Sequence, residues 1–374
     1  MSELADLSEL HEELRTVARG LLGTASTGSI GSIGSAGLAD PVAWRRFAEV
    51  GWLGLEAPER LQGSGATFAE TAVVLEELGR AATTTSYLGS VVLGVGALNA
   101  VVPSAERDEL LGTVAVGERR VAVALASSGD LALVEPAFRL VGAGGDLRLS
   151  GRAEFVADAG EADEVLVLAE TGAGGLVLVA VPATDLAVTV QPVVDATRGF
   201  ATVAAEEVAV SPTAVWSFAG PAESAPQAAQ RILDRGALAV ACDSLGLGAA
   251  MLEATVAYVS ARHQFGRPVG SFQAVKHQCA DMLVQLTVGR ELLDAAIEAI
   301  VDLRADPTIE VSRAASFLGD AAVDVAGTAM QLHGGIGYSW ESGIHVYLKR
   351  ATLNRSLFGS PAAHRRRLAG VLRG

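Results

Sequence analysis

The sequence predicts an α+β protein in which a block of strands lies between two blocks of helices. Apolar residues recur at helical spacing near the N-terminus, and short Val/Leu-rich runs separated by Gly, Asp and Pro occupy the middle. Long Ala/Leu-rich segments fill the C-terminal part. This order differs from the βαβ alternation of a nucleotide-binding Rossmann sheet. We expect three domains, at residues 1–112, 113–226 and 227–374.

Two features indicate that the N-terminal domain is helical. Apolar residues recur at helical spacing in the first helix, and the segment 68–80 (FAETAVVLEELGR) does the same. The stretch Tyr87–Ala105 has no charge and is nearly long enough to span a bilayer, but several Gly and polar residues interrupt it. We therefore predict a buried helix there and no membrane segment.

The middle domain reads as an all-β unit, a small sandwich or barrel. Its apolar runs are RRVAVALA, LALVEP, FRLVG, DLRLSG, DEVLVLAE, GLVLVAVP, LAVTVQPV and ATVAAEEVAV. Turn residues separate them about every dozen positions, and several runs alternate apolar with polar residues. The segment 212–226 (PTAVWSFAGPAESAP) is rich in Pro, Gly and Ser, which indicates a crossing to the last domain.

The C-terminal domain is predicted to be a bundle of long antiparallel helices. Helical segments extend over 228–262, 271–303 and 310–333, which is longer than most globular helices. The predicted order along the chain is therefore a helical domain, a domain of strands, and a second helical domain.

Composition narrows the class of protein. The 374 residues carry a formal net charge of −15, and a field of that sign repels nucleic acid. The two cysteines, Cys242 and Cys279, are too few for a disulfide framework or a zinc cluster. The acidic N-terminus lacks the features of a secretion signal. We expect a cytoplasmic protein with no metal, nucleic-acid or membrane partner.

Two segments of the C-terminal domain carry groups suited to a polyanion. In 261–278 (ARHQFGRPVGSFQAVKHQ) one helix ends, the chain turns, and a new helix is expected at Ser271, capped by its hydroxyl. In 331–338 (QLHGGIGY) a helix ends in a Gly-rich loop, where Gly permits positive φ and close approach to the backbone. Separately, Arg262 could be a helix-dipole partner and the Gly pair a simple helix stop. Together, an Arg fork, the Gln331 amide and free N–H groups suit a pyrophosphate.

These segments resemble the acyl-CoA dehydrogenase family, and the resemblance covers essentially the whole chain. The family's first-domain signature resembles 51–59 (GWLGLEAPE) and the following 63–65 (GSG), and the next helix resembles 75–80 (LEELGR). The segment 195–200 (DATRGF) is similar to a late turn of the β domain. The most specific matches are 262–273 and 331–338.

The resemblance implies a helical N-terminal domain, a β middle domain, a C-terminal four-helix bundle, and FAD held between two subunits. It implies that the bundle of one chain binds the nucleotide half of the FAD of a neighbouring chain. By the resemblance, the residues at this half are Arg262, Gln264, Phe265, Gln273, Gln331, Gly334 and Gly335. The implied reaction is α,β-desaturation of an acyl-CoA, in which a carboxylate removes the α-proton and flavin takes the β-hydride.

The family's catalytic base is missing from both of its known positions. Many members carry Tyr-Glu-Gly-Thr near the C-terminus, where this chain has Leu-Phe-Gly-Ser with Phe358 at the Glu position. Others carry the Glu on the first bundle helix, where this chain has Gly236. Asp234 lies two residues earlier and is rotated by about 200° around a helix, so we expect it to be a solvated surface residue.

The segments that face the flavin ring in the family are also altered. The segment 126–136 (ASSGDLALVEP) keeps only fragments of the flavin loop. Where the family has Trp-Ile-Thr-Asn against the ring, this chain has Phe155-Val-Ala-Asp, and Ala157 lacks the hydroxyl expected to bond the ring.

These losses favour one subunit of a heteromeric FAD-dependent acyl-CoA dehydrogenase, an oxidoreductase of lipid metabolism. A homologous subunit would supply the base and the ring cleft, as in the family's heterotetramers of steroid side-chain degradation. The expected partners are this subunit, an acyl-CoA, and electron-transfer flavoprotein or a similar acceptor. Two alternatives stay open: a self-sufficient homotetrameric dehydrogenase or oxygenase, and a non-catalytic scaffold of the same fold.

Overall fold

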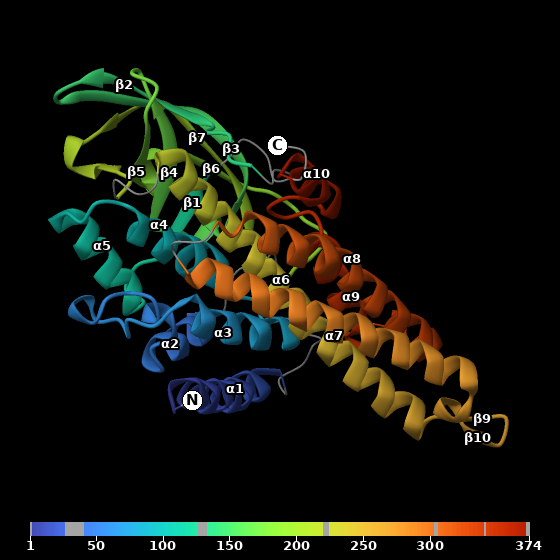
Figure 1. The fold of residues 1–374 in the computed structure, drawn as a ribbon. Coiled ribbons are helices and arrows are strands. Elements are labelled where there is room, and N and C mark those ends of the chain that lie inside the picture. The colour runs from blue at the N-terminus through green and yellow to red at the C-terminus, as the bar shows by residue number, and fades with distance from the viewer. Residues whose placement is uncertain are drawn as a thin grey trace. The chain divides into compact units, whose positions relative to one another are not determined.

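The computed structural model describes residues 2–26, 41–125, 133–219, 224–302, 306–339 and 342–371. Its internal contacts divide the chain into two compact units (Figure 1). Unit 1 comprises residues 1–34, 72–83 and 238–374, and unit 2 comprises 35–71 and 84–237. Helices α3 (Phe68–Arg80) and α6 (Ala225–Ala261) each begin in unit 2 and end in unit 1. The predicted class of mixed helix and sheet is confirmed, and the domain boundaries stay predictions.

Unit 2 contains the strands together with short helices. The strands are β1 (Val121–Ala124), β2 (Phe138–Ala143), β3 (Asp146–Ala157), β4 (Glu164–Thr171), β5 (Leu176–Pro182), β6 (Ala187–Val190), β7 (Phe200–Val210) and β8 (Val215–Ser217). The helices are α2 (Pro41–Glu49), η3 (Leu88–Val95), α4 (Gly96–Ala100) and α5 (Ala105–Ala115). The strands form one mixed sheet in the order β6-β7-β3-β2-β4-β5-β8, with β1 paired to β4. Alternating Val, Leu and Ala side chains from these strands form its buried core.

Two details of the strand prediction differ from the structure. The described part of LALVEP, residues 133–136, is not a strand, and the rest of that run lies outside the described residues. β8 lies in the segment that was predicted to be a crossing, because Val215, Trp216 and Ser217 pair with β5 although Pro and Gly surround them.

The buried helix predicted at 87–105 is confirmed over residues 88–100, with an unexpected geometry. Residues Leu88–Val95 form a π-helix in which every residue is buried. Its Ser90 hydroxyl donates to the Val121 carbonyl of β1 at 2.8 Å, and the Gly89 N–H donates to Asp158 at 2.7 Å. These side-chain and backbone bonds fix the helix to the sheet of the same unit.

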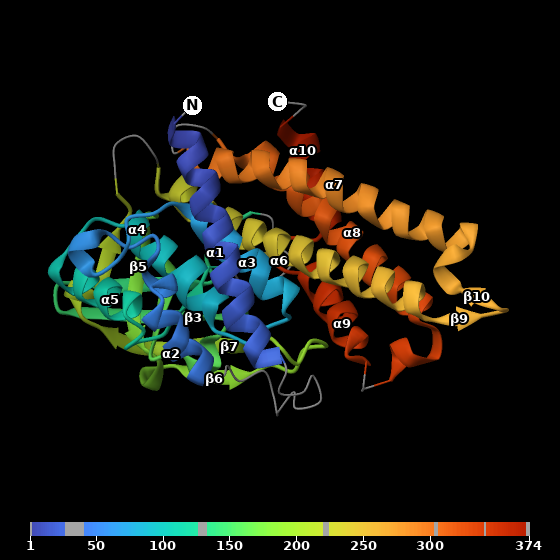
Figure 2. The same ribbon diagram turned by 90° about the horizontal axis from the view of Figure 1, so that it is seen from below.

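Unit 1 is helical, as Figure 2 shows from below. Besides the end of α6 it contains α1 (Ser2–Ser26), α7 (Gln273–Val301), α8 (Thr308–His333), α9 (Ile344–Asn354) and α10 (Pro361–Val371). On α7 the buried residues Met282, Leu286, Gly289, Leu293, Ala296 and Ile300 recur at spacings of three and four, which is the spacing of a bundle seam.

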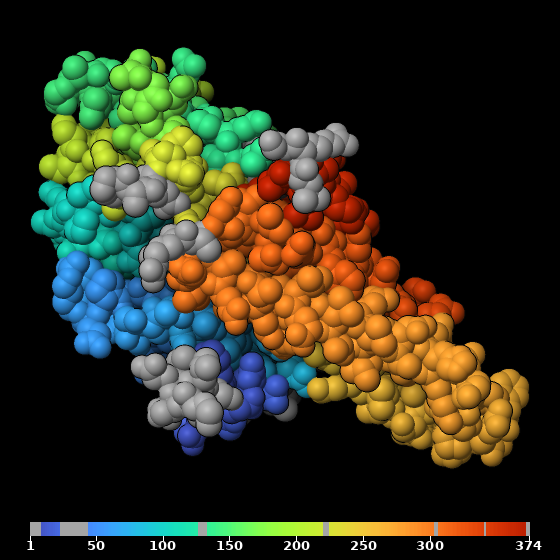
Figure 3. All heavy atoms as spheres, viewed as in Figure 1, coloured from blue at the N-terminus to red at the C-terminus, as the bar shows by residue number. Residues whose placement is uncertain are grey.

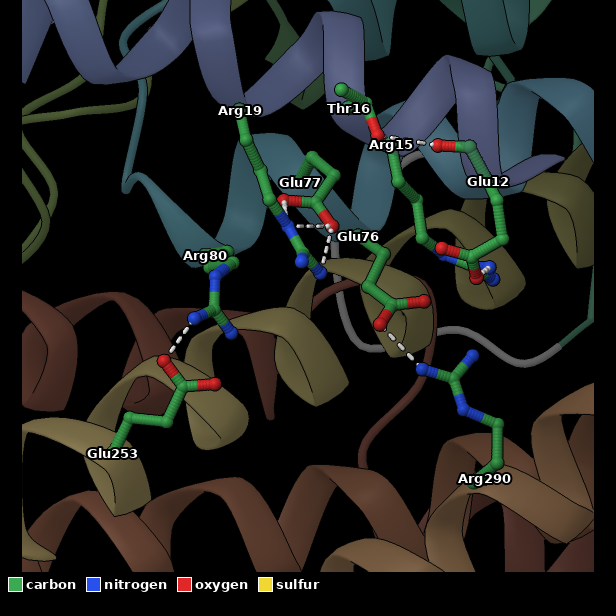
Figure 4. Close-up of polar contacts among 9 residues, drawn as sticks. All are labelled: Glu12, Arg15, Thr16, Arg19, Glu76, Glu77, Arg80, Glu253 and Arg290. Atoms are coloured by element: carbon green, nitrogen blue, oxygen red, sulfur yellow. Dashed lines mark hydrogen bonds and ion pairs between the residues drawn. The ribbon is translucent and has the colours of Figure 1, made fainter.

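Within unit 1, α3 and α6 cross at very short range through glycine. A Cβ at Gly79 would lie 2.1 Å from the Asp243 carbonyl oxygen, and a Cβ at Gly246 would lie 1.9 Å from the Glu76 carbonyl oxygen. Glycine is therefore required at both positions. Charged residues surround this crossing (Figure 4). On α3 the pairs are Glu76 with Arg290, Glu77 with Arg19, and Arg80 with Glu253.

A buried ion pair lies close to the same crossing. The Arg350 guanidinium of α9 binds the Asp243 carboxylate of α6 at 2.6 Å, and only 2% of either side chain is exposed. The Asn354 amide and the Thr83 carbonyl complete the hydrogen bonds. A buried charge is tolerated only with such partners, so this cluster fixes α9 against α6.

One described helix, α6, is long and apolar enough by composition to cross a bilayer, but 72% of its most apolar window is buried inside the protein. The apolar residues of α6 are therefore part of the hydrophobic core.

Candidate functional site

The first motif forms a short hairpin at the end of the bundle. After α6 ends at Ala261, His263 and Gln264 of β9 pair with Arg267 and Pro268 of β10. The two residues between them, Phe265 (φ 53°) and Gly266 (φ 77°), form the turn. Positive φ at both central positions is typical of tight hairpins. A phenylalanine there is unusual, and strained residues gather at functional sites.

Aromatic and basic side chains cover the hairpin. Phe265 is 92% exposed, and its ring meets the edge of Phe272 at a centroid distance of 6.2 Å. The Arg267 guanidinium lies 3.9 Å from the centre of the same Phe272 ring. The hairpin forms the tip of the yellow and orange end of unit 1 (Figure 3). The Phe265 ring is therefore accessible to a ligand or to another chain.

The next helix begins later than the sequence suggested. Val269–Ser271 form a short 3-10 turn, and α7 starts at Gln273 after Phe272. The predicted capping role of Ser271 is wrong, because its hydroxyl donates to the Pro268 carbonyl at 2.7 Å. This bond closes the turn, which leaves Gln273 exposed in the first turn of α7.

The second motif begins at the C-terminus of α8. His333 ends that helix, and Gly334–Tyr338 form a 3-10 turn. Gly334 has φ 61° and ψ −142°, a conformation essentially confined to glycine. A Cβ at Gly335 would meet nothing within 4 Å, so the solvent side of its backbone is open. The expectation of positive φ thus holds at Gly334.

A stacked ring pair joins the two motifs. Tyr258 of α6 and His333 of α8 lie with centroids 4.5 Å apart and planes inclined by 21°. Tyr258 lies one turn before Arg262, whose N–H donates to the Tyr258 carbonyl at 2.9 Å. His333 directly precedes the glycine turn. Segments 258–273 and 331–338, which are far apart in the sequence, therefore lie together at one end of unit 1, which we call the bundle end.

All seven predicted nucleotide-binding residues are exposed at this end: Arg262, Gln264, Phe265, Gln273, Gln331, Gly334 and Gly335. Among the described residues, no side chain pairs with the Arg262 guanidinium. Between Glu253 and Asp281 the chain has no acidic residue, whereas Arg262, Arg267 and Lys276 are all exposed. In a chain of net charge −15, this end is a local basic surface suited to an anion.

The sequence motifs did not reveal the roles of four further residues, Tyr258, Arg267, Phe272 and His333. The signal was present, since the aromatic Tyr258 lies one helical turn before Arg262 and His333 lies inside the glycine motif. Only the structure shows which rings meet.

Neither position of the family's base carries an acid. Phe358 is half-buried in the turn between α9 and α10 with φ 52°, and the buried His364 donates its Nε2–H to the Phe358 carbonyl at 3.1 Å. Gly236 is buried within α6. The expectation for Asp234 is wrong: it is 2% exposed and accepts from the Gln230 amide at 3.0 Å.

The altered ring-facing segment lies at the end of β3 in unit 2. Phe155 has φ 51° and is 40% exposed, and its N–H donates to the Gln191 side chain at 2.7 Å. Ala157 is buried, and Asp158 accepts the Gly89 N–H. The Asp195 carboxylate accepts the hydroxyl and N–H of Thr197, which orders the 195–200 turn. Residues 126–132 of the degenerate loop lie outside the described residues.

Comparison with known proteins agrees with the fold and the motifs. A model of the acyl-CoA dehydrogenase N-terminal domain matches residues 8–118, and one of the C-terminal domain matches 226–372. Acyl-CoA dehydrogenase IpdE2 of Mycolicibacterium smegmatis is 32% identical over 330 residues, covering 88% of this chain and 87% of the relative. The chain belongs to the acyl-CoA dehydrogenase family and so to a class of FAD-dependent oxidoreductases.

Two solved structures are similar over nearly the full length. One is a variant of the Tcur3481–Tcur3483 steroid acyl-CoA dehydrogenase, at 28% identity and a TM-score of 0.85, with 98% of each chain covered. The other is the ChsE4–ChsE5 complex of Mycobacterium tuberculosis, at 27% identity and a TM-score of 0.85, with 98% of this chain and 96% of that chain covered. Both names describe pairs of different chains.

Proposed function

We propose that this chain is the base-lacking subunit of a heteromeric, FAD-dependent acyl-CoA dehydrogenase. One observation carries the proposal: the residues predicted to bind the nucleotide are exposed at the bundle end, while both positions of the family's base hold residues without a carboxylate, Phe358 and Gly236. A homologous partner chain then supplies the base and the flavin-ring cleft. The resemblance to two structures named for pairs of different chains supports such a pairing.

The bundle end fits the nucleotide half of FAD. The Arg262 guanidinium is exposed, and a planar fork of this kind matches phosphate oxygens. Gly334 and Gly335 bring backbone close to an anion without a side chain in the way. Gln264, Gln273 and Gln331 supply amides at the same end, and the exposed Phe265 ring is available to pack on the nucleotide.

FAD, when bound, supplies the acceptor for the hydride that leaves the β-carbon of the acyl-CoA. The protein has to hold substrate and cofactor in line and provide a carboxylate for the α-proton. This chain contributes binding and orientation through the bundle end. The carboxylate comes from the partner, because Phe358 and Gly236 accept no proton and Asp234 is buried against Gln230.

The name of one similar structure, a steroid acyl-CoA dehydrogenase, suggests the substrate class. We infer that the complex acts in the cytoplasm on a bulky acyl-CoA of the steroid side-chain type and passes electrons to electron-transfer flavoprotein or a similar acceptor. Turnover assays with steroid and fatty acyl-CoA of equal chain length distinguish these substrate classes.

The test is the visible flavin spectrum and native mass of the chain alone and after co-expression with a homologous, Glu-bearing chain. We expect a yellow complex of two chain types and no stoichiometric flavin on the lone chain. A yellow, active homotetramer of this chain alone would contradict the proposal and favour the self-sufficient alternative.

Arg262→Ala in the complex tests the nucleotide role, with Arg139→Ala as a matched control because the Arg139 side chain is 79% exposed and lies in unit 2. Because Arg262→Ala removes a charged hydrogen-bonding partner, we expect its dissociation constant for FAD to rise roughly tenfold to hundredfold, and that of Arg139→Ala to stay unchanged. Equal FAD content and activity in both variants would favour the scaffold alternative.

A further inference from the structure

The Tyr258–His333 stack connects the two segments that form the bundle end, 258–273 and 331–338. Tyr258 belongs to the helix that leads into Arg262, and His333 belongs to the helix that leads into Gly334. Among the described residues, no hydrogen bond or ion pair joins segment 258–273 to segment 331–338. The ring pair, with centroids 4.5 Å apart, is therefore a direct contact that couples the positions of the two segments.

The His333 ring is held in one orientation. Its Nδ1–H donates to the Ala329 carbonyl one turn earlier at 2.7 Å, and only 7% of the residue is exposed. A ring fixed by its own helix cannot rotate away from Tyr258 without losing that bond. The stack is thus a rigid link between α6 and α8.

The glycine turn rests on His333. A Cβ at Gly337 would lie 3.1 Å from the His333 Cβ and 2.7 Å from the Met330 carbonyl oxygen, so the turn folds back closely over the end of α8. A shift of His333 therefore displaces the turn that carries Gly334 and Gly335. On the other side of the stack, a shift of Tyr258 displaces the backbone that fixes Arg262.

We propose that Tyr258 and His333 are positioning residues that set the spacing between Arg262 and the Gly334–Gly335 turn, and thereby the strength with which this end holds the FAD pyrophosphate. The inference rests on the proposed function, in which these groups hold a nucleotide. It assigns the effect to the stack of two rings, with no contact between the imidazole and the cofactor.

The experiment measures the FAD dissociation constant of the complex of this chain with its partner, after removal and re-addition of FAD, by flavin fluorescence. The variants are Tyr258→Leu, His333→Leu, the double variant, and His333→Phe, which keeps a flat ring. Because aromatic stacking is modest in strength, we expect each Leu variant to bind FAD about two- to tenfold more weakly. His333→Phe should bind like the wild type.

The double variant distinguishes a stack from two separate contacts. If the rings act as a pair, removal of the second adds little, so the double variant should bind FAD about as weakly as either single variant. Multiplicative losses would overturn the inference, as would wild-type FAD binding in both single variants. A His333→Phe variant as weak as His333→Leu would also overturn it, because a flat ring stacked on Tyr258 would then not be enough to maintain FAD binding.

Two controls separate this inference from its premise and from a general loss of structure. If Arg262→Ala weakens FAD binding while the ring variants do not, the proposed function stands and only the inference fails. If Arg262→Ala has no effect, the proposed function itself fails. Thermal unfolding of the FAD-free complex detects a general destabilisation, and a loss of stability with unchanged FAD affinity would assign the stack a purely structural role.

Discussion

Asp158 is a carboxyl group of unit 2 whose ionised form is disfavoured by burial, and Asp158→Asn should remove this destabilising effect. Burial raises the pKa of Asp158 from 3.8 to about 7. The Gly89 N–H and the positive charges of Arg198 and Arg120 act in the opposite direction, and the nearby Glu161 adds to the rise. Asparagine has the shape of the protonated acid and can still accept the Gly89 N–H.

The backbone also favours this substitution. Asp158 has φ 60° and ψ 10°, a left-handed conformation that Asn tolerates better than other residues with a side chain. Asp158→Ala is the contrasting control, because it loses the acceptor for the Gly89 N–H and fits that conformation poorly. We expect Asp158→Ala to be destabilised at every pH.

The size of the effect follows from the pKa change. A group with a raised acid pKa in the folded state destabilises that state as pH rises from about 4 to above 7, since the unfolded chain ionises first. One pKa unit corresponds to about 1.4 kcal/mol. Relative to the protein with Asp158 protonated in both states, the free energy of unfolding is therefore lower by about 4 kcal/mol at pH 8.5 and by only about 1.5 kcal/mol at pH 5. Relative to the wild type, Asp158→Asn should therefore raise the free energy of unfolding by about 2.5 kcal/mol more at pH 8.5 than at pH 5.

Urea denaturation followed by tryptophan fluorescence measures this gain. Three of the chain's four tryptophans, Trp44, Trp52 and Trp216, lie in unit 2, so most of the tryptophan emission comes from the unit that contains Asp158. If the free energies of unfolding of the wild type and Asp158→Asn differ by the same amount at pH 5 and pH 8.5, the reasoning is refuted, because the pKa of Asp158 would then not be raised in the folded protein.

Two further pairs of substitutions test the packing of unit 1. Gly246→Ala should lower the free energy of unfolding by about 1–3 kcal/mol because its Cβ has no room beside the Glu76 carbonyl. In the same bundle, Gly327→Ala should raise it by up to about 1 kcal/mol, since nothing lies within 4 Å of a Cβ there. Arg350→Met should cost about 3–5 kcal/mol by leaving the buried Asp243 without its guanidinium partner. Arg313→Met, which breaks an exposed pair with Glu310, should cost less than about 1 kcal/mol; equal losses in these two Arg variants would show that burial does not govern the pair energies.

Much of the fold could be predicted because local patterns and tertiary packing agree. The long helices of the bundle follow from apolar periodicity, and most strands follow from Val/Leu-rich runs between turn residues. β8 was missed because its three residues are strand-forming only through pairing with β5. The π-helix at 88–95 was missed because apolar periodicity does not distinguish an added residue per turn from a regular helix.

The site was predicted as two motifs, and its assembly was not. Arg262 and the Gly334–Gly335 pair could be identified from residue type and resemblance. The ring contact between Tyr258 and His333 depends on how two helices meet, which spacing along one helix does not encode. The error at Asp234 has the same origin: the angular position of a residue on one helix does not show what packs against it, and Asp234 is buried.

The division of the sequence between the two units has a consequence for biosynthesis. Every residue of unit 2 has been synthesised once position 237 is reached, whereas unit 1 needs residues from the first 34 positions, from 72–83 and from the last 137. Contacts between distant segments form slowly because long loops must close first. The strand-containing unit can therefore fold while translation continues. The early helices α1 and α3 must wait for the C-terminal helices, and during that interval their apolar faces are candidates for chaperone binding.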